Sequence, residues 1–263
     1  MLEYMKRAAG YFNLLILMAK RDVSIKYSQS YFGIAWIVLQ PITGMLIFTL
    51  IFTQAFLINT DEIGMPYYLF CFSGYICWIL FSNIISGAGN SLIQEENLIK
   101  KVYFPRILVP ASKSLNYIID FLMGVVILLL IGIFYDISIL YRIWLTMPAV
   151  ILVLLNSAMI AIWLSALTIR YRDFNHVIPY IINFGIWITP VFIPLNFFPK
   201  KIRYIVELNP MTYAIELFRS ICFGIPIPTM TTTFVLAQII VLVLLFFGLR
   251  YFIKIDKLLS DYL

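Results

Sequence analysis

Charge, histidine and cysteine are all scarce in this chain, and each shortage excludes a class of protein. Only 12 per cent of the 263 residues are charged, against about 25 per cent in ordinary soluble domains. One histidine, His176, and three cysteines without CxxC spacing are too few for a typical zinc or iron site. We therefore expect Cys71, Cys77 and Cys222 to be buried thiols with neither a disulfide nor a metal.

Nucleotide-binding and nucleophile motifs are also missing. The chain contains no GxxxxGK[ST] and no GxGxxG, so no phosphate-cradling loop can be recognised, and nothing resembles a nucleophile elbow. We expect no cofactor in this chain, so that any ATP and Mg²⁺ must be bound by another subunit. No small-residue cleavage site follows the interrupted N-terminal apolar run, which predicts that no signal peptide is removed.

Apolar residues are abundant, at 62 per cent of the chain, against about 45 to 50 per cent in soluble domains. They form blocks of about 20 residues or more, long enough to cross a bilayer, without the alternation of a membrane barrel. The predicted fold class is an all-α integral membrane protein with a single transmembrane domain, 1–263. The net charge of +6 is better explained by membrane topology than by nucleic-acid binding.

The apolar blocks predict six transmembrane helices that form a bundle over 33–252. Both termini then lie on one side, which carries fourteen Lys and Arg residues against five on the other. The positive-inside rule makes that side cytoplasmic. The predicted spans are 33–58, 67–89, 107–134, 143–169, 176–194 and 232–252, followed by a cytoplasmic tail, 253–263.

The residues before the first span have the pattern of an amphipathic interface helix. Between residues 3 and 28, Lys6, Asn13 and Lys20 recur on one helical face, with apolar residues on the other. A solvated tail is the alternative, but the run from Leu14 to Met18 is too apolar for one.

A short polar island, Ser91 to Pro105, interrupts two long apolar stretches and predicts a helix on the membrane surface. Ser91 and Gln94 have capping-box spacing, acidic residues occupy the first turn, basic residues occupy the last, and Pro105 prevents continuation. Such an island is a handle by which a soluble partner could move the membrane part.

The segment from Phe198 to Gly224 predicts two helices of roughly ten to twelve residues, each too short to cross a bilayer. Asn209 is a good N-cap, Pro210 a good first helical residue and Gly224 a good stop. Counting this segment as a span would place the C-terminal basic residues outside. A re-entrant pair on the outer side is therefore the better interpretation.

Two features inside the spans have both functional and structural explanations. The first is a polar stripe formed by Lys113, Asn116, Tyr117 and Asp120. It indicates either a proton or substrate relay, or interhelical contacts with a snorkelling lysine. The absence of a partner acid favours the interhelical contacts. Aromatic stripes at Phe48, Phe52, Phe56, Phe184 and Trp187 are typical of packing, but flat rings could also contact a sliding glycan.

Four stretches resemble the membrane subunits of type-2 ABC exporters, in the branch that moves lipid-linked polysaccharides such as O-antigen. They are RDVSIKYSQSYFGIAWIVLQP (21–41), KVYFPRILVPAS (101–112), RYRDF (170–174) and TPVFIPLNFFPKKIRYIVELNPMTYAIELFR (189–219). The resemblance implies a homodimer in the bacterial cytoplasmic membrane, two copies of a separate ABC ATPase subunit, and a prenyl-pyrophosphate-linked polysaccharide as cargo.

The resemblance also implies roles for particular residues. It makes 95–104 a coupling helix on the ATPase, places a gating turn at the end of the interface helix within 1–32, and makes 195–224 an outer gate. The first and fifth spans then line a conduit, which raises the five aromatic residues to candidate glycan contacts. The implied coupling residues are Glu95, Glu96, Asn97, Leu98, Lys100, Lys101, Val102, Tyr103 and Phe104; the gating residues are Arg21, Asp22, Lys26, Tyr27 and Ser30; the outer-gate residues are Pro199, Asn209, Pro210, Glu216 and Arg219.

Three alternatives remain open at the level of the sequence. The cargo could be teichoic acid, capsular polysaccharide or a small-molecule drug instead of O-antigen. A stand-alone ion-coupled transporter or flippase would need several buried acids and internal repeats, and the sequence offers one acid and no clear repeat. A membrane enzyme acting on lipid-linked sugars would need clustered acids, and Asp61 with Glu62 reads as a solvated turn.

Overall fold

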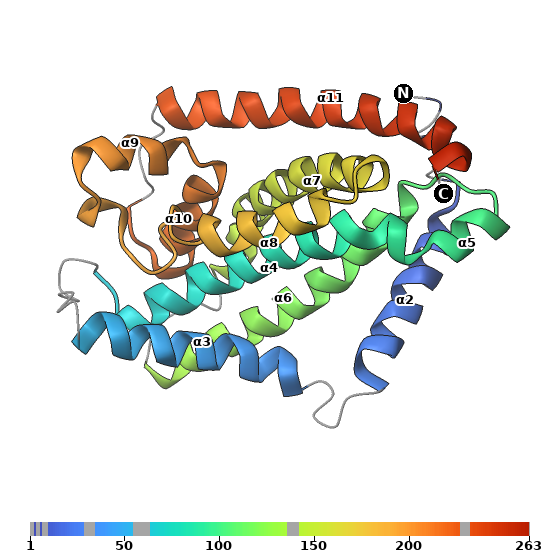
Figure 1. Cartoon of the computed structure of the whole chain (residues 1–263). Coiled ribbons are helices and arrows are strands. Elements are labelled where there is room, and N and C mark those ends of the chain that lie inside the picture. The colour runs from blue at the N-terminus through green and yellow to red at the C-terminus, as the bar shows by residue number, and fades with distance from the viewer. Residues whose placement is uncertain are drawn as a thin grey trace.

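The computed structural model describes residues 3, 6, 10–28, 35–54, 64–135, 142–226 and 232–262, and these residues form a helical bundle without strands. Helix α2, Phe12–Ser28, descends steeply from one end of the bundle, while α11, Thr232–Tyr262, runs along its top in the view of Figure 1. Ser30, Phe56, Asp61 and Glu62 lie outside the described residues, as does the side chain of Tyr27.

Five helical segments of the described chain are long and apolar enough to cross a membrane. They agree closely with five of the six predicted spans. These segments are α3 (Ala35–Gln54), α4 (Tyr67–Gln94), α6 (Leu108–Phe134), the short 3-10 turn η2 (Ile143–Thr146) continued by α7 (Met147–Arg170), and α11. The last helix continues to Tyr262, so the predicted tail is largely an extension of that helix.

Helix α4 is the central element of the bundle. In its most apolar 18-residue window 78 per cent of the residues are buried, against 17 per cent in α3 and 22 per cent in α11. It packs against α3, α6, α7, α8 (Phe174–Gly185) and α10 (Pro210–Phe223). Small residues permit this packing, because a Cβ added at Gly89 would lie 2.7 Å from Ile178 of α8.

The predicted fifth span, 176–194, is not one continuous helix. Helix α8 has 12 residues, which at 1.5 Å per residue cover about 18 Å of a core of about 30 Å. Turns follow through Phe192, where the backbone carbonyl accepts a hydrogen bond of 2.6 Å from the hydroxyl of Tyr67 at the start of α4. The segment therefore runs antiparallel to α4 from Gly89 to Tyr67, partly as helix and partly as irregular chain.

Two helices, α9 (Lys200–Leu208) and α10, follow the short 3-10 turn η3 (Leu195–Phe197). The boundary between them lies at Asn209 and Pro210, as the sequence predicts. Asn209 caps α10 by accepting a hydrogen bond from the backbone N–H of Met211 at 3.0 Å, and Pro210 is its first residue. Gly224 ends α10 with φ of 70°, a left-handed conformation that favours glycine. Helices of 9 and 14 residues are too short to span a bilayer alone.

A second hydrophobic core lies at the end of the bundle that holds α5, Glu96–Lys101, which we call the α5 end; the opposite end, with α9 and α10, is the α9 end (Figure 1). Met18 of α2, Leu92 of α4, Ile99 of α5 and Phe252 of α11 all contribute to this core. The α5 end is therefore packed as a unit and not as a set of loops.

Candidate functional site

Helix α5 is a short surface helix, but it begins later than the capping-box spacing predicts. Ser91 is not an N-cap: it lies inside α4 and its hydroxyl donates to the carbonyl of Ala88 at 2.7 Å. Ser91 and Leu92 are completely buried, and this burial carries α4 one turn beyond the predicted start of the polar island. The chain bends at Glu95, after which α5 runs for six residues.

The polarity of α5 matches the sequence prediction, with Glu96 in its first turn and Lys100 and Lys101 in its last. Lys100 hydrogen-bonds to Glu96 one turn away, and this bond lowers the pKa of the Glu96 carboxyl. Lys100 is exposed and Glu96 is partly exposed, so this pair stabilises the helix only slightly.

The nine predicted coupling residues divide by burial. Phe104 is buried in the second core and fixes α5 to the bundle. Ile99, which was not among the nine predicted residues, is buried there too and has the same effect. The remaining predicted residues either face solvent or border it, and Tyr103 is 70 per cent exposed. The exposed ones are Asn97, Lys100, Lys101, Val102 and Tyr103, with Glu96 and Leu98 intermediate.

Glu95, at the bend before α5, turns inward and joins an ion-pair network. One of its carboxylate oxygens contacts both Arg21 of α2 and, at 3.3 Å, the ammonium of Lys113 of α6. Asp22 bridges the same two cations, 2.8 Å from Arg21 and 2.7 Å from Lys113. The network therefore connects three elements, and its hydrogen bonds to Asp22 and Glu95 hold the pKa of Arg21 above its ordinary value even though burial lowers it.

A second ion pair lies about one turn further along α2 and two turns further along α6. Lys26 pairs with Asp120, and its ammonium lies 5.3 Å from the centre of the Tyr117 ring. The predicted polar stripe on α6 is therefore confirmed as a contact surface, since three of its members meet α2. Asp120 has a basic partner in α2, which supports the interhelical explanation over a lone relay acid.

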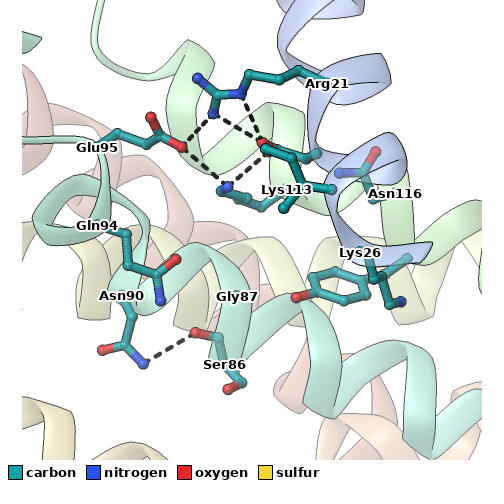
Figure 2. Close-up of a pocket in the computed structure, with 12 residues that line it drawn as sticks. Arg21, Lys26, Ser86, Gly87, Asn90, Gln94, Glu95, Lys113 and Asn116 are labelled. Carbon is teal, nitrogen blue, oxygen red and sulfur yellow. Dashed lines mark hydrogen bonds and ion pairs between the residues drawn. The ribbon is translucent and has the colours of Figure 1, made fainter. Parts of the chain in front are cut away.

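A cavity of about 580 Å³ lies beneath these pairs, between α2, α4 and α6. Figure 2 shows Arg21 from α2 and Lys113 from α6 turned toward the same point, with Asn90 and Gln94 of α4 on the other side of the cavity. Asn116 is 6 per cent exposed, and its side-chain oxygen finds no hydrogen-bond partner among the described residues. The lining is charged and polar: Arg21, Asp22, Ile25, Lys26, Ser86, Gly87, Asn90, Gln94, Glu95, Lys113, Asn116 and Tyr117.

The predicted aromatic contacts fall into two groups. Phe52 is 4 per cent exposed, and Phe48 stacks on Phe192 with ring centres 3.6 Å apart, so both pack inside the bundle. Phe184 and Trp187 are instead 64 and 52 per cent exposed. Trp187 also borders a hollow of about 510 Å³ between α3, α4 and α8, together with Tyr75, Trp78 and several amide side chains.

Arg219 of α10, which the resemblance makes an outer-gate residue, is 2 per cent exposed and lies inside the α9 end. Its guanidinium donates to three backbone carbonyls, those of Phe70 at 2.9 Å, Pro190 at 2.6 Å and Val191 at 2.7 Å. Glu216, the neighbouring outer-gate prediction, accepts at 2.9 Å, while Pro199 stands at the start of α9. Arg219 therefore satisfies two carbonyls of the irregular chain that follows α8 and one carbonyl of α4.

Both the ion-pair network and the Arg219 clamp were missed by sequence reasoning. Arg21 and Glu95 are 74 residues apart, and Arg219 and Phe70 are 149 apart. A local signal existed only for Arg219, because a basic residue inside an apolar helix, five residues before the glycine that ends it, requires a partner.

The described residues thus form a multi-helix membrane protein with a rigidly mounted surface helix at one end. The chain belongs to the ABC-2 type transporter family, whose match covers residues 13–223.

Relatives in this family match nearly the whole chain. It is 25 per cent identical over 247 residues to the O-antigen export system permease protein RfbA of Myxococcus xanthus, covering 93 per cent of both chains. It is also 25 per cent identical over 220 residues to the protein of the same name from Klebsiella pneumoniae, covering 82 per cent of this chain and 83 per cent of the relative.

Proposed function

We propose that this chain is the permease subunit of an ATP-driven ABC transporter that exports O-antigen polysaccharide across the bacterial cytoplasmic membrane. Family membership and the export function in the names of relatives that match at least four fifths of the chain support this function. The chain itself is a transport subunit, and a separate ATPase supplies the energy.

One observation carries the proposal, namely the mounting of α5. Ile99 and Phe104 anchor the helix in a core shared with α2, α4 and α11, while Lys100, Lys101 and Tyr103 remain exposed. A force applied to the exposed face is therefore transmitted to three long helices at once. This is what a coupling helix must do when an ATPase docks on it, and in this proposal the α5 end faces the cytoplasm.

We propose six crossings, of which the segment that begins with α8 is the fifth. This segment runs beside α4 from Gly89 to Tyr67, a stretch of α4 about 33 Å long, which supports a crossing despite its irregular second half. Helices α9 and α10 then form a re-entrant pair at the outer face. Both termini lie in the cytoplasm, in agreement with the positive-inside rule.

In the proposed mechanism two copies of the chain form the pathway, and two ATPase subunits move their α5 helices on binding ATP. A prenyl-pyrophosphate-linked polymer enters from the cytoplasmic leaflet, attracted by the basic end of α2 that holds Lys20, Arg21 and Lys26. Among the described members of the predicted aromatic set, Phe184 and Trp187 are exposed and can contact sugar rings along the way.

Reconstitution tests this function directly. Proteoliposomes that contain the chain, its ATPase and lipid-linked O-antigen are expected to transfer the polymer only when ATP is present. Liposomes without the ATPase are expected to be inert. ATP-independent transfer by the chain alone contradicts the proposal and favours a stand-alone carrier.

A further inference from the structure

We propose that the cavity between α2, α4 and α6 is a diphosphate site, in which the bound anion replaces Glu95 on Arg21 and Lys113 and so releases the residue that precedes α5. This inference rests on the proposed function, since the anion in question is the headgroup of the exported lipid. In this inference, binding of the cargo headgroup changes the contacts of the helix on which the ATPase docks.

The cavity has the size and chemistry that such a ligand requires. Its volume of about 580 Å³ falls within the range of roughly 300 to 1,000 Å³ that is typical of small-molecule sites. Arg21, Lys26 and Lys113 line it as cations, and Figure 2 shows Arg21 and Lys113 turned toward the same point. A guanidinium fork and an ammonium are the groups that bind phosphate oxygens most strongly in proteins.

Glu95 is the carboxylate that the anion can displace. Both of its cation contacts use one oxygen, and its distance to Lys113 is 3.3 Å, against 2.7 Å for Asp22. Asp22 uses a separate oxygen for each cation and lies next to Arg21 in α2, so it can stay in place. A diphosphate carries more charge than one carboxylate and therefore competes well for Arg21 and Lys113.

The wall of the cavity on α4 adds neutral donors for phosphate oxygens. Asn90 and Gln94 line it, and each carries a side-chain NH2 group that can donate hydrogen bonds to an anion. The NH2 group of Asn90 donates to the carbonyl of Ser86 at 3.3 Å and keeps a second N–H for the anion.

Release of Glu95 acts directly on α5. Glu95 is the N-cap residue of α5, with φ of −100° and ψ of 20°, and its carbonyl accepts from the backbone N–H groups of Leu98 and Ile99. While its side chain holds Arg21 and Lys113, α5 is tied to α2 and α6. Once an anion takes those cations, α5 keeps only its apolar anchors and can change its position relative to α2.

Binding measurements on the full-length chain in nanodiscs test the site. The probes are inorganic pyrophosphate, and nanodiscs that contain undecaprenyl diphosphate or, as the comparison, undecaprenol. Arg21→Gln and Lys113→Gln are expected to weaken diphosphate binding about tenfold or more, whereas Glu95→Gln removes the competitor and strengthens it about tenfold. Arg203→Gln and Glu207→Gln disrupt a similar ion pair on α9 and serve as matched controls.

The two probes identify the source of the anion. Binding of both probes, or of the diphosphate lipid alone, supports a headgroup site. Binding of inorganic pyrophosphate without the lipid overturns the assignment to cargo. Unchanged affinity in Glu95→Gln overturns the exchange, and unchanged affinity in Arg21→Gln and Lys113→Gln overturns the site.

A distance measurement tests the release of α5. Spin labels at Ser24→Cys on α2 and Asn97→Cys on α5 occupy exposed positions, while the three native cysteines are buried. Pyrophosphate is expected to shift the distance distribution, and Glu95→Gln to show the shifted distribution without ligand. An identical distribution in all three states contradicts the inference. ATP-dependent export is measured separately, so loss of the proposed function and loss of this site can be told apart.

Discussion

Lys26 of α2 forms an ion pair with Asp120 of α6 and joins the N-terminal helix to a membrane-spanning helix. The two residues are 94 positions apart, and the pair gives the acid inside the predicted third span a structural partner. The pair gives Asp120 a structural role as a contact between α2 and α6, which supports the interhelical explanation of this acid.

Asp120→Asn is therefore expected to weaken the contact between α2 and α6 by about 1 kcal/mol and to leave the pH dependence of export unchanged. Thermal unfolding and export between mildly acidic and mildly basic pH measure the two effects. A carrier that uses this acid should lose its pH dependence in the variant, and that result would count against the permease assignment.

Reversal of both α5 lysines, Lys100→Glu with Lys101→Glu, is expected to abolish export while the protein remains folded and inserted. The reason is that both side chains are exposed and α5 is held by Ile99 and Phe104, not by them. Co-purification with the ATPase and export assays give the readout. The double substitution to arginine keeps both charges and should restore export; export that survives the reversal contradicts the docking role of α5.

Arg219→Gln is expected to lower the free energy of unfolding by about 3 kcal/mol, because three buried carbonyls lose a charged donor. Gly74→Ala should have a similar consequence, since an added Cβ collides with the same guanidinium and lies 3.1 Å from the carbonyl oxygen of Val191. Thermal stability in detergent measures both. Arg203→Gln removes an exposed α9 cation and should change stability by less than about 1 kcal/mol.

Changing the aromatic residues to alanine should affect stability or export according to how deeply each side chain is buried. Phe52→Ala is expected to cost about 3 to 5 kcal/mol of stability because the ring lies in the core. Trp187→Ala and Phe184→Ala should leave stability nearly unchanged, because both side chains are more than half exposed, but slow polymer export. Equal export by the wild type and by both exposed-ring variants would remove these residues from the glycan pathway.

The sequence predicted those parts of the fold that depend on interactions between residues close together along the chain. The lengths of the apolar blocks predicted the five long helices, and most of the described ends of these helices lie within a few residues of the predicted ones. The Asn209, Pro210 and Gly224 signals predicted both ends of α10 correctly. The charge pattern of α5 was also predicted from the sequence. In each of these cases the determining interaction lies within a few residues along the chain.

Tertiary contacts decided the remaining features. Burial of Ser91 and Leu92 extends α4 past a good capping signal. The irregular chain after Gly185 is supported by the Arg219 guanidinium and the Tyr67 hydroxyl, which no hydropathy pattern can reveal. The cavity depends in the same way on residues that α2, α4 and α6 bring together from three parts of the sequence.

The central position of α4 also has a consequence for biogenesis. The most apolar 18-residue window of α4 has a mean hydropathy of 1.7, the lowest such value among the five long apolar helices of the described residues, which otherwise range from 2.0 to 2.7. A helix enclosed by neighbours needs little affinity for lipid, so it can carry the serine and asparagine side chains that line the internal hollows. We expect its insertion by the translocon to depend on the helices synthesised after it, more than that of any other long helix in the bundle.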